Sequence, residues 1–244
     1  MINKEKILVT ICARGGSKGL KNKNILKLCG KPLITYTISI AKSLKNFFSC
    51  DIAISSDSKE IIDISKNNGL KTDYVRPNYL AKDETGKVET IKHLLHYEEK
   101  KRKLKYDYIL DLDVSSPMRT IADITKSFLI LKSNEKAMNI FSVNSCNRNP
   151  YFNMVEKNEK TGFFNIVKKP LDALKSRQNS PKVYDLNASI YWFRRKFFDK
   201  NYISQITNRS LIYEMKHLCF DIDTKRDFDY MSYIFESKRF ELEL

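Results

Sequence analysis

Short apolar runs alternate with amphipathic segments of helix length through the first half of the chain. This alternation is typical of β-α-β units, which build a mostly parallel sheet with helices packed on its faces. We expect strands at residues 6–13, 51–55, 71–74, 106–112 and 139–143. Helices are expected at residues 33–43, 59–68, 88–100 and 121–132. The pattern predicts an α/β fold with a doubly wound, mostly parallel sheet.

The alternation of strand-like and helix-like segments stops around Asn149-Pro150. Residues 151–156 and 162–167 have the pattern of two strands of a hairpin, and a polar stretch follows from 168 to 182. We therefore expect residues 146–186 to form a small β-rich subdomain inserted into one domain that spans residues 1–244. Strand character returns at residues 188–193 and 217–222, and a last helix is expected over residues 226–236.

Composition supports a folded protein with anionic partners. The 244 residues are 42% hydrophobic, enough for a proper core. The net charge of +15 favours nucleotides, acidic sugars, nucleic acid or a membrane surface as partners, although lysine is abundant everywhere and the excess is also compatible with compositional drift. Five cysteines without a C-x-x-C pair argue against a disulfide framework and a structural zinc site. The apolar run before Arg14 is too short for a signal peptide or a membrane span, so we expect a cytoplasmic protein.

A glycine-rich, cationic loop follows the first expected strand. Residues 12–24 read Cys-Ala-Arg-Gly-Gly-Ser-Lys-Gly-Leu-Lys-Asn-Lys-Asn. The glycines let successive backbone N–H groups turn toward an anion, and the arginine and lysines add positive charge. The loop matches neither the ATPase P-loop nor the dinucleotide fingerprint. It predicts a site for phosphates such as a triphosphate, the alternative being a solvated, lysine-rich turn.

Two aspartate pairs have the spacing that puts both carboxylates on one side of a strand. Asp221 and Asp223 lie at the end of the strand expected at 217–222 and are suited to hold Mg²⁺ with substrate phosphates, unless Asp223 only caps the last helix. Asp111 and Asp113 end a central strand, where ligands bind in open α/β sheets. The second pair is suited to orient a hydroxyl or bind metal, or else it caps a turn.

Arginines in two expected loops offer a further kind of contact. Arg76 and Arg177 are suited to bidentate recognition of a carboxylate or a phosphate, or they are simply solvated. The three histidines show neither metal-ligand nor catalytic-triad spacing, and we expect His93 and His96 at the surface.

These segments, in this order, resemble the CMP-sialic acid synthetase family of cytidylyltransferases, which activate nine-carbon 2-keto sugar acids, the nonulosonic acids. The resemblance rests on residues 13–24, 55–57, 75–77, 80–83, 116–119, 177–178, 187–191 and 220–224. It implies a Rossmann-like nucleotidyltransferase fold. It also implies a homodimer, because the family's inserted subdomain reaches the partner's active site.

The resemblance also implies roles for individual residues. CTP would contact Ala13, Arg14, Gly15, Gly16, Ser17, Lys18, Lys23, Asn24, Arg76 and Lys87. Mg²⁺ would be bound by Asp221 and Asp223. The acidic nine-carbon sugar would contact Asp113, Ser115, Ser116, Arg119, Arg177, Gln178 and Asn187. We expect Arg14, Lys23, Asp113 and Asp223 to carry the catalytic step. Asp113 is the candidate for orienting the attacking hydroxyl, and a metal-bound arrangement through Asp223 is the alternative.

Two positions differ from the neuraminic acid branch of that family. Where the branch typically has Gln-Pro-Thr-Ser-Pro-Leu-Arg, residues 113–119 read Asp-Val-Ser-Ser-Pro-Met-Arg, and Lys87 replaces a serine on the nucleoside side. Together with residues 148–153 and 184–187, these positions resemble the legionaminic acid branch, whose sugar carries acylamino groups at C5 and C7. The expected reaction joins such a sugar to CTP and releases pyrophosphate.

Other functions remain open at this stage. Within enzymes, the acceptor could be N-acetylneuraminate, 3-deoxy-octulosonate or a sugar phosphate. The charge, with 13 tyrosines and 14 phenylalanines, would also suit a nucleic-acid-binding protein. The aromatics fall mainly in apolar runs and no nucleic-acid motif is present, so we expect neither nucleic acid nor membrane as a partner.

Overall fold

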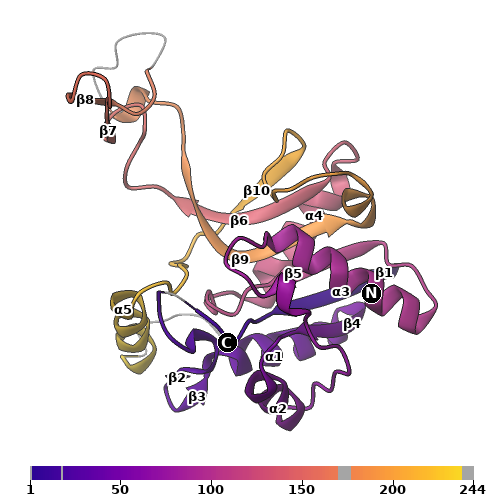
Figure 1. The fold of residues 1–244 in the computed structure, drawn as a ribbon. Helices are drawn as coiled ribbons and strands as arrows, with labels where there is room; N and C mark the ends of the chain where they lie inside the picture. Colours follow the sequence, from indigo (N-terminus) through magenta and orange to yellow (C-terminus); the bar gives the residue numbers. More distant parts are fainter. Residues whose placement is uncertain (1, 18, 170–176, 238–244) are drawn as a thin grey trace.

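The computed structural model describes residues 2–17, 19–169 and 177–237, and its main feature is a six-stranded mixed sheet (Figure 1). Its strands, in the order β10-β6-β9-β5-β1-β4, are β10 (Ser210–Glu214), β6 (Asn139–Ser145), β9 (Tyr184–Arg194), β5 (Tyr108–Leu112), β1 (Ile2–Cys12) and β4 (Phe48–Ser55). Parallel pairing joins β1 to β4 and β5, and β10 to β6. β9 runs antiparallel between β5 and β6. The predicted α/β fold with a mostly parallel sheet is confirmed.

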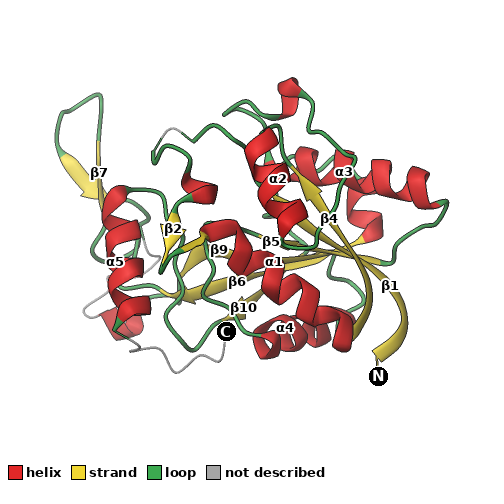
Figure 2. Cartoon of the chain, turned by 90° about the horizontal axis from the view of Figure 1, so that it is seen from below, coloured by secondary structure: helices red, strands yellow, loops and turns green. Residues whose placement is uncertain are grey.

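Helices cover both faces of this sheet. One apolar cluster holds residues of α1 (Leu33–Ser43), α2 (Lys59–Asn67), α4 (Ile121–Ser133) and α5 (Lys225–Glu236), and Figure 2 looks onto this side. A second cluster lies on the opposite face under α3 (Lys87–Arg102) and the 3-10 helix η5 (Arg195–Asp199). Strand alternation explains the division, since Ile7 and Val9 of β1 join the first cluster and Leu8 joins the second.

Local sequence signals set the starts of the helices. α4 and α5 each begin with a capping box, in which Thr120 pairs with Asp123 and Thr224 pairs with Asp227. The Ser58 hydroxyl accepts a hydrogen bond from the Ile61 amide at the start of α2. The five predicted helices are therefore all present, with ends within two residues of expectation.

Two predicted strands are wrong. Residues 71–74 form an irregular segment after α2, in which the Tyr74 amide bonds to the Thr72 hydroxyl rather than to a neighbouring strand. Residues 217–222 form a loop, and the last strand of the sheet is instead β10. In both segments the apolar residues that suggested a strand, such as Tyr74, Cys219 and Ile222, are buried by tertiary packing. The backbone of these segments does not pair with a strand of the sheet.

Short elements complete the body of the molecule. A small hairpin, β2 (Lys27–Leu28) and β3 (Lys31–Pro32), turns through Cys29 and Gly30, both with positive φ. Single turns of 3-10 helix lie at η1 (Lys23–Ile25), η2 (Leu44–Asn46) and η3 (Asn78–Leu80). None of these short elements was predicted from the sequence, because elements of two or three residues have no periodicity of apolar positions. No helix of the described residues has the length and apolarity needed to cross a bilayer.

An arm stands away from the sheet between β6 and β9 (Figure 1). It contains the antiparallel pair β7 (Val155–Lys157) and β8 (Phe164–Ile166) and the turn η4 (Arg177–Asn179). The predicted hairpin is confirmed, but its first strand starts later than expected. The Asn149 side chain accepts the Tyr151 amide and its carbonyl accepts those of Phe152 and Asn153, which fixes a turn there.

Candidate active site

A cleft of about 490 Å³ opens beyond the carboxyl ends of β1 and β5. Ligands bind at this edge of open α/β sheets, because the loops that follow parallel strands converge there. The loop after β1, the segment leading into α3 and the residues after β5 form its walls. Ten of the predicted site residues line it: Arg14, Ser17, Lys23, Asn24, Arg76, Lys87, Asp113, Ser115, Asp221 and Asp223.

The glycine-rich loop and the second aspartate pair meet in this cleft although they lie at opposite ends of the sequence. Lys23 Nζ is 2.9 Å from Asp223 Oδ1. A Cβ atom at Gly19 would lie only 2.4 Å from the carbonyl oxygen of Asp223, so glycine is required for this approach. The predicted phosphate loop and the predicted metal ligands therefore face one shared space.

The backbone of the loop is held from behind. The Gly15 amide donates to Asp57 Oδ1 at 2.9 Å, and a Cβ there would crowd the Cβ of Ser58 at 2.9 Å. The Asn24 side-chain amide donates to the Arg14 carbonyl at 2.9 Å. These contacts give the loop a defined shape before any ligand binds.

Two further residues expected to contact CTP, namely Ala13 and Gly16, differ in their surroundings. Ala13 is buried and its amide donates to the Ser55 carbonyl at 2.9 Å, which continues the strand pairing. A Cβ at Gly16 would meet no atom within 4 Å. Lys18 lies outside the described residues.

Two arginines present cations to the cleft in different ways. Arg14 pairs with Asp83 at 2.7 Å and is partly exposed. Arg76 is buried and held rigidly, because its Nε donates to the Ser55 hydroxyl and its Nη2 to the Ser55 carbonyl, both at 2.8 Å. Arg76 is thus pre-positioned, whereas Arg14 would exchange its carboxylate for an anionic ligand.

Asp221 and Asp223 are suited to Mg²⁺. Burial, and then the charges of Asp223 and Asp113, raise the pKa of Asp221 above its usual range, so added positive charge would be favourable there. Among the described residues no three acidic, histidine or cysteine side chains are arranged to hold a metal. Two carboxylates completed by substrate phosphates and water are a usual Mg²⁺ arrangement, and this pair fits it.

Helix capping does not account for Asp223. The cap of α5 is Thr224, whose hydroxyl accepts from the Asp227 amide. The Asp223 carboxylate instead faces Lys23 across the cleft. The alternative that Asp223 only caps the last helix is wrong.

The first aspartate pair surrounds a lysine. Lys87, the first residue of α3, places its Nζ 3.0 Å from Asp111 Oδ2 and 2.6 Å from Asp113 Oδ2. The Ser115 amide and hydroxyl donate to Asp113 Oδ1 at 2.9 and 2.8 Å. Burial alone would raise the pKa of Asp113, but Lys87 and these donors hold it well below its usual range. Lys87 lines the cleft as expected, with two carboxylate partners that the sequence reading did not foresee.

Two residues expected at the sugar lie behind the wall of the cleft. Arg119 is fully buried and donates through Nη2 to the carbonyl oxygens of Asp113 and of Ser116, the latter at 2.6 Å. The Ser116 hydroxyl donates to the Phe220 carbonyl at 3.2 Å. These groups tie residues 113–116 to the loop that carries Asp221.

Asn187 is also buried, between Ser142 and Asn144, with a side-chain contact to each at 2.6 and 2.7 Å. Arg177 and Gln178 belong to η4, in the arm that stands away from the sheet (Figure 1). Their expected contacts with the sugar stay predictions.

The structure adds residues that received no role from the sequence. Asp57 anchors the Gly15 amide, and Asp83 pairs with Arg14. Both lie in segments that carry the family resemblance, which was the available signal. Ala188 lines the cleft with a positive φ of 54°, an uncommon conformation for a residue with a side chain, at a register shift between β6 and β9.

Comparison with known proteins decides the family. Residues 8–242 match the family model for cytidylyltransferases. The chain belongs to the cytidylyltransferase family. It is a nucleotidyltransferase of the acylneuraminate cytidylyltransferase type.

Two relatives of this cytidylyltransferase align along almost the whole chain. A post-translational flagellin modification protein B of Campylobacter coli is 37% identical over 236 residues, which cover 97% of either chain. A CMP-N,N'-diacetyllegionaminic acid synthase of Campylobacter jejuni is 37% identical over 234 residues, which cover 96% of either chain.

A solved structure confirms the nucleotidyltransferase fold. The cytidylyltransferase superposes on a CMP-2-keto-3-deoxy-manno-octonic acid synthetase, solved in complex with CTP, with a TM-score of 0.68 at 15% identity. The match covers 96% of this chain and 99% of that one.

Proposed function

We propose that this cytidylyltransferase joins CTP to a nonulosonic acid, specifically legionaminic acid or a 5,7-diacylamino relative, and releases pyrophosphate. The observation that carries the proposal is the meeting of the cationic glycine loop with Asp221 and Asp223 in one cleft. The identity of 37% to a protein named CMP-N,N'-diacetyllegionaminic acid synthase supports the choice of acceptor.

In the proposed reaction the C2 hydroxyl oxygen of the sugar forms a bond to the α-phosphorus of CTP. The bond from that phosphorus to its bridging oxygen breaks, and pyrophosphate leaves with the electron pair. Arg14 and Lys23 bind the phosphates after exchanging their partners Asp83 and Asp223. Asp221 and Asp223 would hold Mg²⁺, which would supply positive charge to neutralise the phosphates. Asn24 and Arg76 contribute hydrogen bonds on the nucleoside side.

Asp113 orients the attacking hydroxyl in this proposal. Because its pKa is held low, the carboxylate is ionised throughout the working range but is a weak base. It is therefore suited to accept a hydrogen bond from the hydroxyl, whose proton passes to solvent water as the phosphoester bond forms. Positioning and electrostatic stabilisation carry most of the rate.

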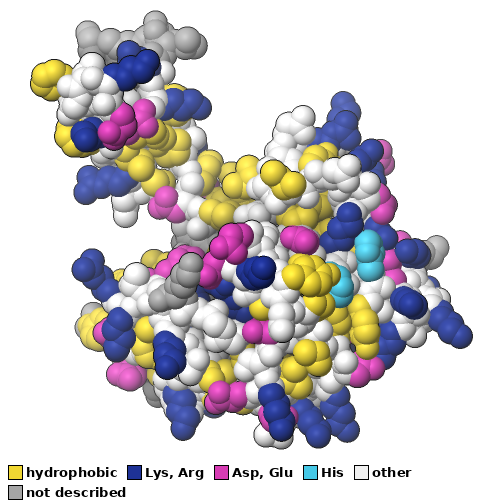
Figure 3. Space-filling model, in the orientation of Figure 1, with side chains coloured by type: hydrophobic (Ala, Val, Ile, Leu, Met, Phe, Trp, Pro, Cys, Tyr) yellow, Lys and Arg dark blue, Asp and Glu magenta, His cyan; other side chains and the backbone are white. Residues whose placement is uncertain are grey.

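The arm supports a homodimer. The side chains of Val155, Phe163 and Phe164 are 64%, 76% and 67% exposed, and Figure 3 shows hydrophobic side chains gathered on the arm. Apolar groups clustered on a projecting element are typical of a protein interface. In the dimer Arg177 and Gln178 would reach the partner's cleft and contact the sugar. We place the reaction in the cytoplasm.

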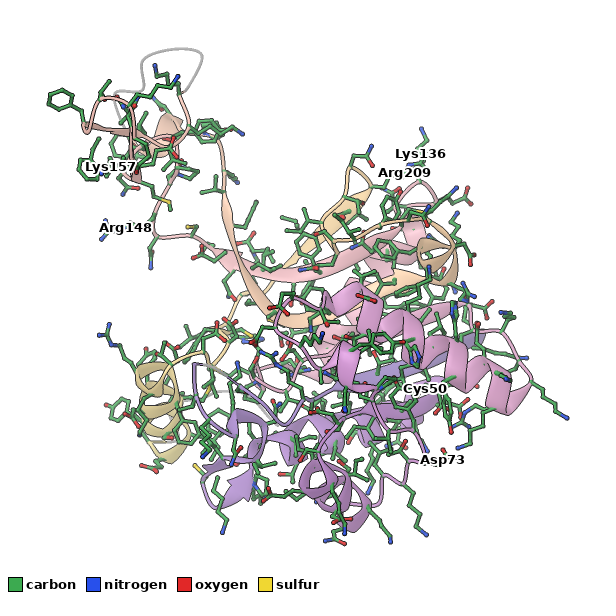
Figure 4. All side chains as sticks on the ribbon, in the orientation of Figure 1. Cys50, Asp73, Lys136, Arg148, Lys157 and Arg209 are labelled. Atoms are coloured by element: carbon green, nitrogen blue, oxygen red, sulfur yellow. The ribbon has the colours of Figure 1, made fainter. Side chains whose placement is uncertain are left out.

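Nucleic acid binding is less well supported. Lysine and arginine side chains are scattered over the face seen in Figure 3 and mixed with acidic ones. Figure 4 shows labelled examples, with Arg148 and Lys157 on the arm and Lys136 and Arg209 at another corner of the molecule. A nucleic-acid-binding site would need the lysine and arginine side chains to be gathered in one continuous patch of the surface.

Pyrophosphate release tests the proposal. Purified protein, CTP and Mg²⁺ are offered legionaminic, neuraminic, pseudaminic and 3-deoxy-octulosonic acids in parallel. We expect the largest kcat/KM with legionaminic acid or its diacetylated form. Release with neuraminic acid alone would move the protein to the neuraminate branch, and release with none of the acids would remove the proposed acceptor class.

A further inference from the structure

Lys87 is enclosed by charged and aromatic groups at the floor of the cleft. Its Nζ contacts Asp111 at 3.0 Å and Asp113 at 2.6 Å, and it lies 4.7 Å from the centre of the Tyr191 ring. The side chain of Lys87 is 22% exposed, and that of Asp111 is 0% exposed. The lysine therefore sits inside the wall and reaches the cleft over only a small part of its surface.

These neighbours occupy most of the hydrogen-bonding positions of the Lys87 ammonium group. A lysine has three N–H donors, of which two face the carboxylates of Asp111 and Asp113. The face of Tyr191 offers a cation–π contact on a further side. Lys23 differs, since its carboxylate partner Asp223 is 68% exposed and readily resolvated. Lys23 can be released to a phosphate, whereas Lys87 is fixed.

The two carboxylates need a cation between them. Asp111 also accepts from the Thr10 hydroxyl at 2.8 Å, and Asp113 from the amide and hydroxyl of Ser115. Neutral hydrogen-bond donors do not neutralise the two negative charges of these carboxylates inside the protein. Two carboxylates this close together therefore bind a cation, or one of them takes up a proton. Lys87 supplies the cation from within the chain.

We propose that Lys87 is a positioning residue that takes the place of a second divalent cation beside Asp111 and Asp113, which fixes Asp113 toward the acceptor and leaves Asp221 and Asp223 to hold one metal ion. The proposal rests on the proposed function for the identity of the acceptor. The occupancy of the Asp111–Asp113 pair by Lys87 is independent of it.

Binding of Mn²⁺, used alone as a probe and followed by electron paramagnetic resonance, tests the proposal without turnover. The variants are Lys87→Met, Lys87→Arg and Asp113→Asn, with Lys100→Met on the exposed side of α3 as the matched control. We expect Lys87→Met to bind one more Mn²⁺ per chain than the wild type, and Lys87→Arg and Lys100→Met to bind the wild-type number. Asp113→Asn should change Mn²⁺ affinity by less than about twofold, because its oxygens are already occupied.

Kinetics with the preferred sugar acid provide the second readout. Lys87→Met should lower kcat by about 10²-fold while the KM for CTP changes by less than about threefold, since Lys87 acts through Asp113 and not on the nucleotide. Lys87→Arg should restore part of the rate.

Three results would overturn the proposal: an unchanged Mn²⁺ number in folded Lys87→Met, a loss of Mn²⁺ affinity of about tenfold or more in Asp113→Asn, or an effect of Lys87→Met confined to the KM for CTP. If Lys87→Met does not fold, Asp113→Asn and Lys87→Arg decide the question. Failure of the proposed function would appear separately, as an absence of pyrophosphate release by the wild type.

Discussion

The aspartates of the cleft differ in what surrounds them, and the surroundings set their chemistry. Asp113 has a lysine and two hydrogen-bond donors, which hold its pKa low. Asp221 is half-buried near two other carboxylates, and both the partial burial and their charges raise its pKa. One carboxylate is therefore kept ionised by the protein, and the other gains most from an added metal ion.

The metal assignment predicts the effect of Asp223→Asn. Because the substitution removes one of two carboxylates and the partner of Lys23, we expect kcat/KM to fall by about 10²- to 10³-fold and the Mg²⁺ concentration for half-maximal rate to rise. The matched control is Asp73→Asn, which removes a surface carboxylate of similar exposure, 60% against 68% for Asp223, that is paired with Lys101. Normal turnover by Asp223→Asn across the Mg²⁺ range would remove Asp223 from the metal site.

The contact between Gly19 and Asp223 predicts a steric effect. Gly19→Ala places a Cβ 2.4 Å from a backbone oxygen, so either the loop or Asp223 must move. We expect the KM for CTP and the requirement for Mg²⁺ to rise together. Gly16→Ala, whose Cβ meets nothing within 4 Å, should have a much smaller effect on both quantities. Equal effects of the two substitutions would contradict the close approach.

At the scale of elements, the loop after β10 depends on α4 for its position. His217 Nε2 contacts Asp123 at 2.9 Å, and Tyr213 donates to the same carboxylate at 2.9 Å. Further along, the Ile222 amide donates to the Ser115 carbonyl at 2.9 Å. The segment after β10 is thus held by α4 at its start and by the residues after β5 near its end, and this keeps Asp221 close to Asp113.

The histidine contact makes stability depend on pH. The hydrogen bond to Asp123 raises the pKa of His217, and burial opposes it only in part. Burial would raise the pKa of Asp123, but donors from His217 and Thr120 lower it to about 2. The His217 contribution is fully present below its unfolded pKa of about 6.5 and is lost as pH rises through its raised folded pKa. The Asp123 contribution is lost as pH falls toward about 2.

His217→Ala should therefore lower the free energy of unfolding by about 1 kcal/mol near pH 5.5, and by less near pH 8.5. Urea unfolding at the two pH values measures the difference. His96→Ala is the control, because burial and the nearby Arg195 lower the pKa of His96 and its protonation does not favour folding. A loss for His217→Ala that is larger at the higher pH would contradict the assigned sign.

At the scale of the molecule, the arm predicts assembly. The double variant Phe163→Ser, Phe164→Ser removes two large exposed apolar side chains without touching the main sheet. We expect the wild type to be a dimer and the variant to shift toward monomer in light scattering after size exclusion. Sugar turnover should fall while CTP binding persists, because the cleft of each chain is intact.

A matched variant separates this effect from general loss of surface hydrophobicity. Phe47→Ser changes an exposed phenylalanine, 49% accessible, on the body of the molecule. Its mass in solution should equal that of the wild type. A monomeric wild type that still converts the sugar acid to its CMP derivative at full rate would show that the arm has another use.

The alternation of apolar and polar residues was enough to predict the fold class, the five α-helices of the described residues and most strands of the sheet, because burial on two faces imposes a periodicity that can be read along the chain. It also identified ten residues that line the cleft, since glycines, cations and strand-end carboxylates are local signals. Local signals failed at residues 71–74 and 217–222, where a few buried side chains imitate a strand.

Which of these groups face one another follows from the packing of the folded chain and not from any local pattern. The contact of Lys23 with Asp223 and the enclosure of Lys87 by Asp111 and Asp113 join residues far apart in sequence, and no local pattern encodes them. Burial separated Arg119 and Asn187 from the exposed residues of similar type, because the cost of enclosing a polar group depends on partners supplied by other elements.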